Sequence, residues 1–309
     1  MNSPKFQINS LPEFWMNIEI KINEKSDVNS FYESIFSEKY LTKWWFIKKL
    51  IFNLYPNLSS QLSTITDEEE RKKIIYDFVH GLYVKYDSQL QNTLQNLTLL
   101  FKNNKELIIA GLSETMDFDP QDIPHIIINP SFKPNSSFWT DKVSLSIVSE
   151  ILYKKPRSYI DIFVHEITHI IWNQKIWKVY DVVWKLWSLA HEDLKEIVTP
   201  VIMRDSCFKN ILTSEYMKNA NEKQQLLNIN IDGVVYNIVD YFEIIYQDMK
   251  GKWNTFEKIM EVFVNIFLKI EDQIISKHAI YNECWFASKD KEEALKILES
   301  KWYMDPIIL

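Results

Sequence analysis

Glycine is nearly absent from this chain. The 309 residues include four glycines (Gly81, Gly111, Gly233 and Gly251), where average usage of about 7% would give roughly 20. Glycine supplies positive φ angles and lets a backbone approach a ligand closely. Neither GxGxxG nor GxxxxGK[ST] occurs in the sequence, which argues against dinucleotide-binding and P-loop enzymes. Collagen-like chains and flexible linkers are excluded as well.

The remaining composition indicates a globular protein without a basic surface. Hydrophobic residues make up 46% of the chain and charged residues 25%, close to ordinary soluble domains. Thirty-five Lys and Arg against 42 Asp and Glu leave a net charge of −7. This balance lacks the electrostatic footprint of a nucleic-acid-binding protein, so we expect no nucleic-acid partner.

Cysteine usage and hydropathy predict a cytoplasmic protein with no membrane span. Cys207 and Cys284 are far apart, which fits a reducing compartment better than a disulfide scaffold. No apolar run follows Met1, so no signal peptide is visible. The longest apolar stretch, 259–270, is interrupted by polar residues and is too short to cross a bilayer.

Hydrophobic periodicity predicts a mostly helical α+β protein. Short strands are expected at Ile18–Ile22, His125–Ile128 and Val143–Ile151, with a hairpin turn at Asp232-Gly233. Helices are expected at 28–54, 67–100 and 103–110 (closed by Gly111), and at 158–175, 182–203, 237–249, 254–277 and 291–300. We expect a helical N-terminal region, 1–115, and a second region, 116–309, or one domain covering both.

The segment from Ser158 to His169 contains the motif HExxH, as HEITH. Pro156 prevents an earlier helix start, and Ser158 with Asp161 forms a capping signal, so the motif is expected on a helix. There His165 and His169 lie one turn apart on one face and can both bind a single Zn²⁺. Glu166 is rotated away from that face, where it can act as general base on a water molecule.

A catalytic zinc ion needs a third protein ligand, and HExxHxxGxxH is absent. HEITH, the preceding strands and a downstream helical Glu resemble the gluzincin type of zincin metallopeptidases, including bacterial members. The resemblance covers about residues 120–205. It implies a zincin-like core, with a small sheet next to the HExxH helix and additional helices on both sides. It also implies Glu196 as the third ligand. Glu192, one turn earlier on the same face, is the second candidate for metal binding or for support of a ligand, and Asp193 is the third.

The resemblance leaves several roles open. Gluzincins often carry an acidic residue four positions after the ligand Glu, to support a zinc-bound His; here that position is Pro200. In the family, an edge strand before the HExxH helix pairs with the extended substrate, which would assign Val143, Leu145 and Ile147 here, although the strand could equally be packed inside the sheet. A Tyr or His usually stabilises the oxyanion, and no spacing selects among the candidates, which are Tyr241, Tyr246, His278, Tyr281 and Tyr303.

The leading hypothesis is a zinc-dependent hydrolase, most simply a metallopeptidase that acts on a peptide or protein substrate. The alternative is a catalytically inactive zincin-like or helical interaction protein that keeps a structural metal. A closed site with four protein ligands, for instance with His191 as the fourth, would indicate this alternative. The sequence carries no signal for the oligomeric state.

Overall fold

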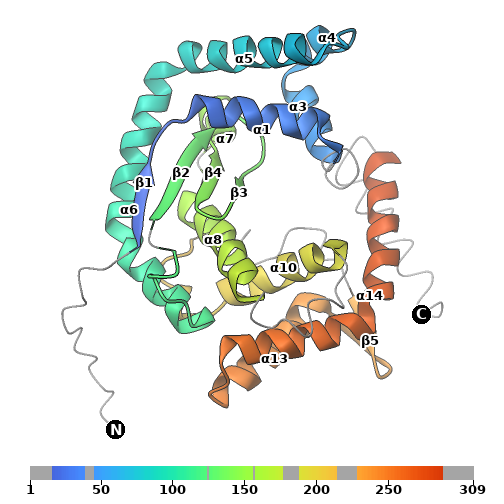
Figure 1. The fold of residues 1–309 in the computed structure, drawn as a ribbon. Helices are drawn as coiled ribbons and strands as arrows, with labels where there is room; N and C mark the ends of the chain where they lie inside the picture. Colours follow the sequence, from blue (N-terminus) through green and yellow to red (C-terminus); the bar gives the residue numbers. More distant parts are fainter. Residues whose placement is uncertain are drawn as a thin grey trace. The chain divides into compact units, whose positions relative to one another are not determined.

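The computed structural model describes residues 16–38, 45–123, 125–155, 157–176, 188–213 and 228–287. These residues are mostly helical and include two small sheets (Figure 1), which confirms the mostly helical α+β class. The chain divides into two compact units, residues 1–114 with 118–157 and residues 115–117 with 158–309. Residues 118–157 thus group with the N-terminal residues, whereas we expected the second region to begin at 116.

The first unit contains six helices and four strands in the described residues. The helices are α1 (Glu24–Phe36), α3 (Trp45–Leu54), α4 (Pro56–Leu62), α5 (Glu68–Lys85), α6 (Asp87–Met116, whose end belongs to the second unit) and α7 (Val148–Ile151), with a further helical residue at 38. The strands are β1 (Asn17–Ile20), β2 (His125–Ser131), β3 (Ser137–Phe138) and β4 (Lys142–Ser146).

The four strands form one sheet in the order β1-β2-β4-β3. β1 and β4 run parallel to β2 on either side of it, and β3 pairs with β4 in the antiparallel direction. Because side chains alternate along a strand, one face of the sheet carries Ile126 and Ile128 of β2 beside Val143 and Leu145 of β4, all fully buried. This apolar face contributes to the core of the first unit.

The opposite face of the sheet is polar and is also buried. Asn129 pairs with Ser144, and Ser131 with Ser146, so these four residues share that face. Helix α1, which begins just after β1 (Figure 1), covers it. One side of α1 presents three further buried polar residues, Asp27, Ser30 and Ser34.

The fully buried Lys133 joins these two surfaces. Its Nζ donates to Ser30 Oγ at 2.8 Å and to Ser137 Oγ at 3.3 Å. Asp27 accepts from the hydroxyl of Tyr83 and the backbone N–H of Phe132, each at 3.1 Å. We call the following residues the Asp27–Lys133 layer: Asp27, Ser30, Ser34, Asn129, Ser131, Lys133, Ser144 and Ser146. Burial raises the pKa of Asp27 to about 6, against the partial opposition of these hydrogen bonds and of the Lys133 charge.

Several expected boundaries in the first unit are wrong. The helix expected at 28–54 ends at Phe36, before the separate helix Trp45–Leu54, and the helix expected at 67–100 is divided at Tyr86. α6 continues through Gly111 to Met116, because Leu112 and Met116 are fully buried. Burying two such side chains gains about 1.5–3 kcal/mol each, which exceeds the cost of about 1 kcal/mol for a glycine inside a helix. The strand expected over Val143–Ile151 ends at Ser146, and Val148–Ile151 form the short helix α7.

The second unit is helical around a small hairpin in the residues described. Its helices are α8 (Tyr159–Ile176), α10 (Ser188–Met203), α13 (Ile238–Gly251) and α14 (Phe256–Ala287), with a 3-10 turn η1 (Ser206–Phe208). These bounds confirm the expected helices within the described residues; the helix expected at 291–300 lies outside them. Within the described residues, no helix is both long enough and apolar enough to cross a membrane.

The predicted hairpin is confirmed as β5 (Asn228–Ile231) and β6 (Val234–Asn237). Its turn residues Asp232 and Gly233 have φ angles of 51° and 85°. Positive φ at both central positions matches the right-handed twist of the two strands, so Gly233 is one of the places where this chain uses a glycine for its backbone freedom.

Candidate metal centre

Helix α8 is buried over most of its surface. Phe163, Val164 and Ile167 are fully buried, and Trp172 is 1% exposed. α8 packs against α10 and α14 of the same unit. A helix held this firmly presents its remaining polar side chains, including both histidines, in fixed directions.

His165 and His169 of α8 and Glu196 of α10 converge at one point. The two Nε2 atoms lie 3.0 Å apart. Glu196 Oε1 lies 3.2 Å from His169 Nε2, and Glu196 Oε2 lies 3.6 Å from His165 Nε2. Among the described residues, these three form a group of potential ligands within 4.8 Å of one another.

These distances suit a tetrahedral zinc ion. Ligand atoms at about 2.0–2.1 Å from a tetrahedral centre are separated from one another by about 3.3 Å. The two Nε2 atoms are 3.0 Å apart, and the Glu196 carboxylate approaches His169 to 3.2 Å through Oε1 and His165 to 3.6 Å through Oε2, close to that value. Two imidazoles and one carboxylate are also a ligand set that zinc uses at catalytic sites. The residues present therefore fit the ion.

Electrostatics keep His169 and Glu196 in the protonation states that a metal needs, neutral and ionised. Burial lowers the pKa of His169 to about 3, so this imidazole is neutral. Burial alone would raise the pKa of Glu196, but its interactions with His169 and His165 hold it well below its usual value. Burial also opposes a charge on His165, and the hydrogen bond and charge of Glu196 outweigh it and raise that pKa. A divalent cation would compete with a proton on His165 for this cluster.

Glu192, the second candidate for the third ligand, has a different partner. Its Oε2 accepts from Nζ of the buried Lys195 at 2.6 Å, and it is not part of the converging group of described residues. Asp193 is not part of that converging group either. The structure therefore brings Glu196, rather than Glu192, to the two histidines.

Thr199, which the sequence did not single out, contacts His169 on the side of the ring opposite the cluster. Its Oγ1 lies 3.1 Å from His169 Nδ1 and donates to the backbone oxygen of Lys195 at 2.9 Å. Thr199 is fully buried. It stands three positions after Glu196, so it occupies the supporting role that we sought at Pro200. The signal available in the sequence was a hydroxyl on the same helical face as Glu196.

Glu166, the expected general base, is 8% exposed in α8. Its charge contributes to the raised pKa of His165, after the larger contribution of Glu196. His165 and Glu196 keep 24% and 21% of their side chains exposed, whereas His169 keeps 2%. The cluster is therefore open to solvent on the side of His165 and Glu196.

The other predicted site residues lie elsewhere or outside the description. Val143 and Leu145 are buried in β4, which lies between β2 and β3, so the expectation that β4 is an edge strand is wrong. Ile147 follows the end of the strand. Tyr246 is buried, with its hydroxyl donating to Thr115 O and Asp205 Oδ2 at 3.2 Å. The side chains of His191, His278 and Tyr281, and all of Tyr303, lie outside the described residues.

Tyr241 packs its ring against that of Tyr236, with centroids 5.0 Å apart. Both residues belong to the segment in which β6 leads into α13. Tyr241 therefore contributes to the packing of this hairpin and helix.

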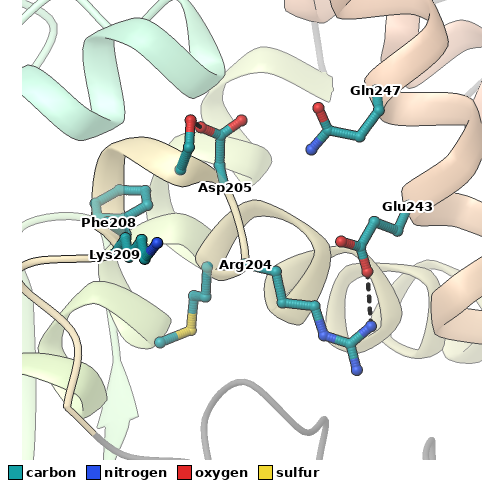
Figure 2. Close-up of a pocket in the computed structure, with 8 residues that line it drawn as sticks. Arg204, Asp205, Phe208, Lys209, Glu243 and Gln247 are labelled. Atoms are coloured by element: carbon teal, nitrogen blue, oxygen red, sulfur yellow. Dashed lines mark hydrogen bonds and ion pairs between the residues drawn. The ribbon is translucent and has the colours of Figure 1, made fainter.

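A pocket of about 540 Å³ lies at the end of α10 (Figure 2). Met203, Arg204, Asp205, Ser206, Phe208, Lys209, Glu243 and Gln247 line it. Arg204 Nη1 donates to Glu243 Oε2 at 2.7 Å and to Asp240 Oδ1 at 2.9 Å. Met203 follows Glu196 by seven residues, about 10 Å along the helix. The pocket and the histidine cluster are therefore separate features of α10.

No known protein family, curated protein or solved structure matches this chain. The functional conclusion below is therefore drawn from the residues and the geometry of the second unit.

Proposed function

We propose that the chain is a zinc-dependent hydrolase, most simply a metallopeptidase with a zincin-like core. His165, His169 and Glu196 would hold the ion and Glu166 would act as general base. The observation that carries this proposal is the convergence of the two Nε2 atoms of α8, the helix that also bears Glu166, with the carboxylate of Glu196 from α10, at separations of 3.0–3.6 Å. A peptide or protein is the substrate that the resemblance to gluzincins implies.

Each residue has a defined task in this reaction. A zinc ion held by such ligands lowers the pKa of water to about 7 and polarises a carbonyl group. Glu166 accepts the proton of the attacking water and passes it to the leaving amine, so the peptide bond breaks without a free hydroxide or a charged amide leaving group. α8 carries two ligands and the base on one rigid element, which keeps their spacing constant during the reaction.

The partial exposure of His165 and Glu196 favours a catalytic site over a purely structural one. A structural zinc ion has four protein ligands, whereas a catalytic one keeps a position for water or substrate. Side chains that are 24% and 21% exposed leave an approach for solvent from that side. The alternative, an inactive protein with a structural metal, requires a fourth protein ligand on this open side.

The test combines metal analysis with two variants. The purified chain should contain one zinc ion, and it should hydrolyse peptides from a mixed library in a manner that a chelator blocks. Glu166→Gln should retain zinc and lose hydrolysis by about 10²–10⁴-fold, the usual contribution of a general base. His169→Ala should lose both zinc and hydrolysis.

Three outcomes contradict parts of the proposal. A chain without stoichiometric zinc overturns the metal site. Undiminished hydrolysis in Glu166→Gln overturns the role of this residue. Zinc retained by an unchanged chain that hydrolyses no peptide supports the structural alternative.

A further inference from the structure

We propose that Thr199 is a positioning residue for the metal site: it accepts the Nδ1 proton of His169 and thereby directs the Nε2 lone pair of that ring toward the ion. This inference rests on the proposed metal site. It adds a residue from α10 that acts through His169 and does not itself touch the metal or the substrate.

The first step is the geometry around the His169 ring. Nε2 faces His165 and Glu196, at 3.0 and 3.2 Å, and Nδ1 faces Thr199 Oγ1 at 3.1 Å. A neutral imidazole carries one proton, on either nitrogen. Binding of a metal through Nε2 requires that the proton be on Nδ1, so whatever accepts at Nδ1 selects the binding-competent tautomer.

The second step is the direction of the hydrogen bonds. A threonine hydroxyl has one proton to donate and two lone pairs to accept with. Thr199 Oγ1 donates to the backbone oxygen of Lys195 at 2.9 Å. Because that bond uses the hydroxyl proton, Oγ1 can act only as an acceptor toward Nδ1. The chain His169 Nδ1–H to Thr199 Oγ1–H to Lys195 oxygen therefore has a single polarity, and it is the one that leaves Nε2 free for a metal.

The third step is burial. Thr199 is fully buried and His169 is 1% exposed, so solvent does not compete for the Nδ1 proton. An N–H left without an acceptor in such surroundings costs about 1–3 kcal/mol. Removal of the Thr199 hydroxyl should therefore favour the other tautomer, in which the proton lies on Nε2 and blocks metal binding.

Thr168 provides a matched control. It is 1% exposed, precedes His169 in α8, and donates its hydroxyl proton to the oxygen of Val164 at 2.7 Å, four residues earlier. Thr199 makes the equivalent bond to Lys195. The change Thr168→Val thus removes a buried threonine hydroxyl with the same helical hydrogen bond, and the pair of variants isolates the contact with His169.

The experiment measures zinc affinity by competition with a chromophoric chelator at fixed pH. Thr199→Val should weaken zinc binding 10–100-fold, the usual loss when a group that orients a ligand is removed. Thr199→Ser keeps the hydroxyl and should restore the affinity to within threefold or so of the unchanged chain. Thr168→Val should bind zinc as tightly as the unchanged chain.

A second readout follows the ring itself. In the zinc-loaded chain, the Nδ1 proton of His169 should give a protected downfield proton NMR signal. It should persist in Thr199→Ser and disappear through exchange in Thr199→Val. If Thr199→Val does not fold, Thr199→Ala and Thr199→Ser give the same comparison with a smaller side chain.

The possible failures are distinguishable. If the unchanged chain binds no zinc, the proposed function fails and the inference fails with it. If the unchanged chain binds zinc and Thr199→Val binds it as tightly, the inference alone is overturned. Equal losses in Thr199→Val and Thr168→Val also overturn it, since they would show a general effect of packing.

Discussion

Each unit of this protein buries a group of ionisable side chains, and the two groups differ in how their charges are balanced. The Asp27–Lys133 layer of the first unit contains both an acid and a cation. Its hydrogen bonds join its own members, the neighbouring backbone and the side chains of Tyr83 and Ser137. In the second unit, the Nε2 atoms of His165 and His169 and the carboxylate of Glu196 point toward one another.

This difference distinguishes a group of buried polar residues that stabilises the fold from one that is suited to bind a ligand. A buried acid with a buried cation nearby and hydrogen bonds to its oxygens needs nothing from outside the chain. Three acceptors that converge within 4.8 Å need a cation between them, whether a proton or a metal. Convergence of lone pairs, and not the burial of polar groups, is therefore the feature that indicates a ligand site.

The largest effect should come from breaking the balance in the first unit. Lys133→Met should destabilise the chain by about 3–5 kcal/mol at neutral pH, the cost of leaving a buried charge without its opposite. Urea unfolding measures this change. Zinc affinity should stay as in the unchanged chain, because Lys133 belongs to the other unit. A stability unchanged by this substitution would show that the lysine does not compensate Asp27.

The second effect is a pH dependence from Asp27. Its pKa is about 6 in the folded chain against 3.8 ordinarily. Between these values the folded chain binds a proton that the unfolded chain has released, so stability falls as the pH rises from about 4 to 6. The full change is about 3 kcal/mol, from about 1.4 kcal/mol per pKa unit.

Asp27→Asn isolates that contribution. The difference in unfolding free energy between the two chains, measured in urea at several pH values, should change by about 3 kcal/mol across the same window. All other titrating groups cancel in this difference. A difference that does not vary with pH would mean that Asp27 has an ordinary pKa in the folded chain.

The third effect distinguishes the two glutamates of α10. Glu196→Gln should weaken zinc binding by more than 100-fold or so, beyond what the loss of a supporting residue costs. Glu192→Gln should change it by less than tenfold or so, because Glu192 pairs with Lys195. Chelator competition measures both. The reverse order would make Glu192 the ligand and remove Glu196 from the cluster.

The smallest effect tests the hydroxyls of the first unit. Within the described residues, the buried Oγ of Ser144 has no hydrogen-bond partner, so Ser144→Ala should be neutral or stabilising. Ser30 accepts from Lys133, and Ser30→Ala should destabilise by about 1.5–3 kcal/mol, the value of a hydrogen bond to a charged group. Equal effects in urea unfolding would contradict this distinction.

Local sequence signals predicted the helices of the second unit well. The expected range 158–175 compares with Tyr159–Ile176 for α8, and Asp232-Gly233 forms the predicted turn. Strong hydrophobic periodicity and positive-φ residues act over a few positions, so a sequence carries them directly. Gly111 shows where local sequence signals fail. A glycine predicts the end of a helix, but the burial of Leu112 and Met116 extends α6 past it, and the residues near Gly111 in the sequence do not reveal that burial.

The Asp27–Lys133 layer could not be predicted, because the sequence pattern of its strand predicts an exposed polar face instead of a buried one. Alternation of Ile128, Asn129, Pro130 and Ser131 is the pattern of a strand with one face in water, but α1 covers that polar face. Thr199 was missed for a related reason. The position four residues after Glu196 was expected to support a histidine, and the supporting hydroxyl is three residues after it, a choice that only the mutual placement of α8 and α10 decides.

The unequal exposure of the two histidines has a consequence for the order of events in metal exchange. His165 and Glu196 reach solvent, and His169 does not. An ion that enters the proposed site from water would therefore meet the outer pair first and His169 last. A chelator would approach from the same outer side, and burial would shield a bond to His169 from it.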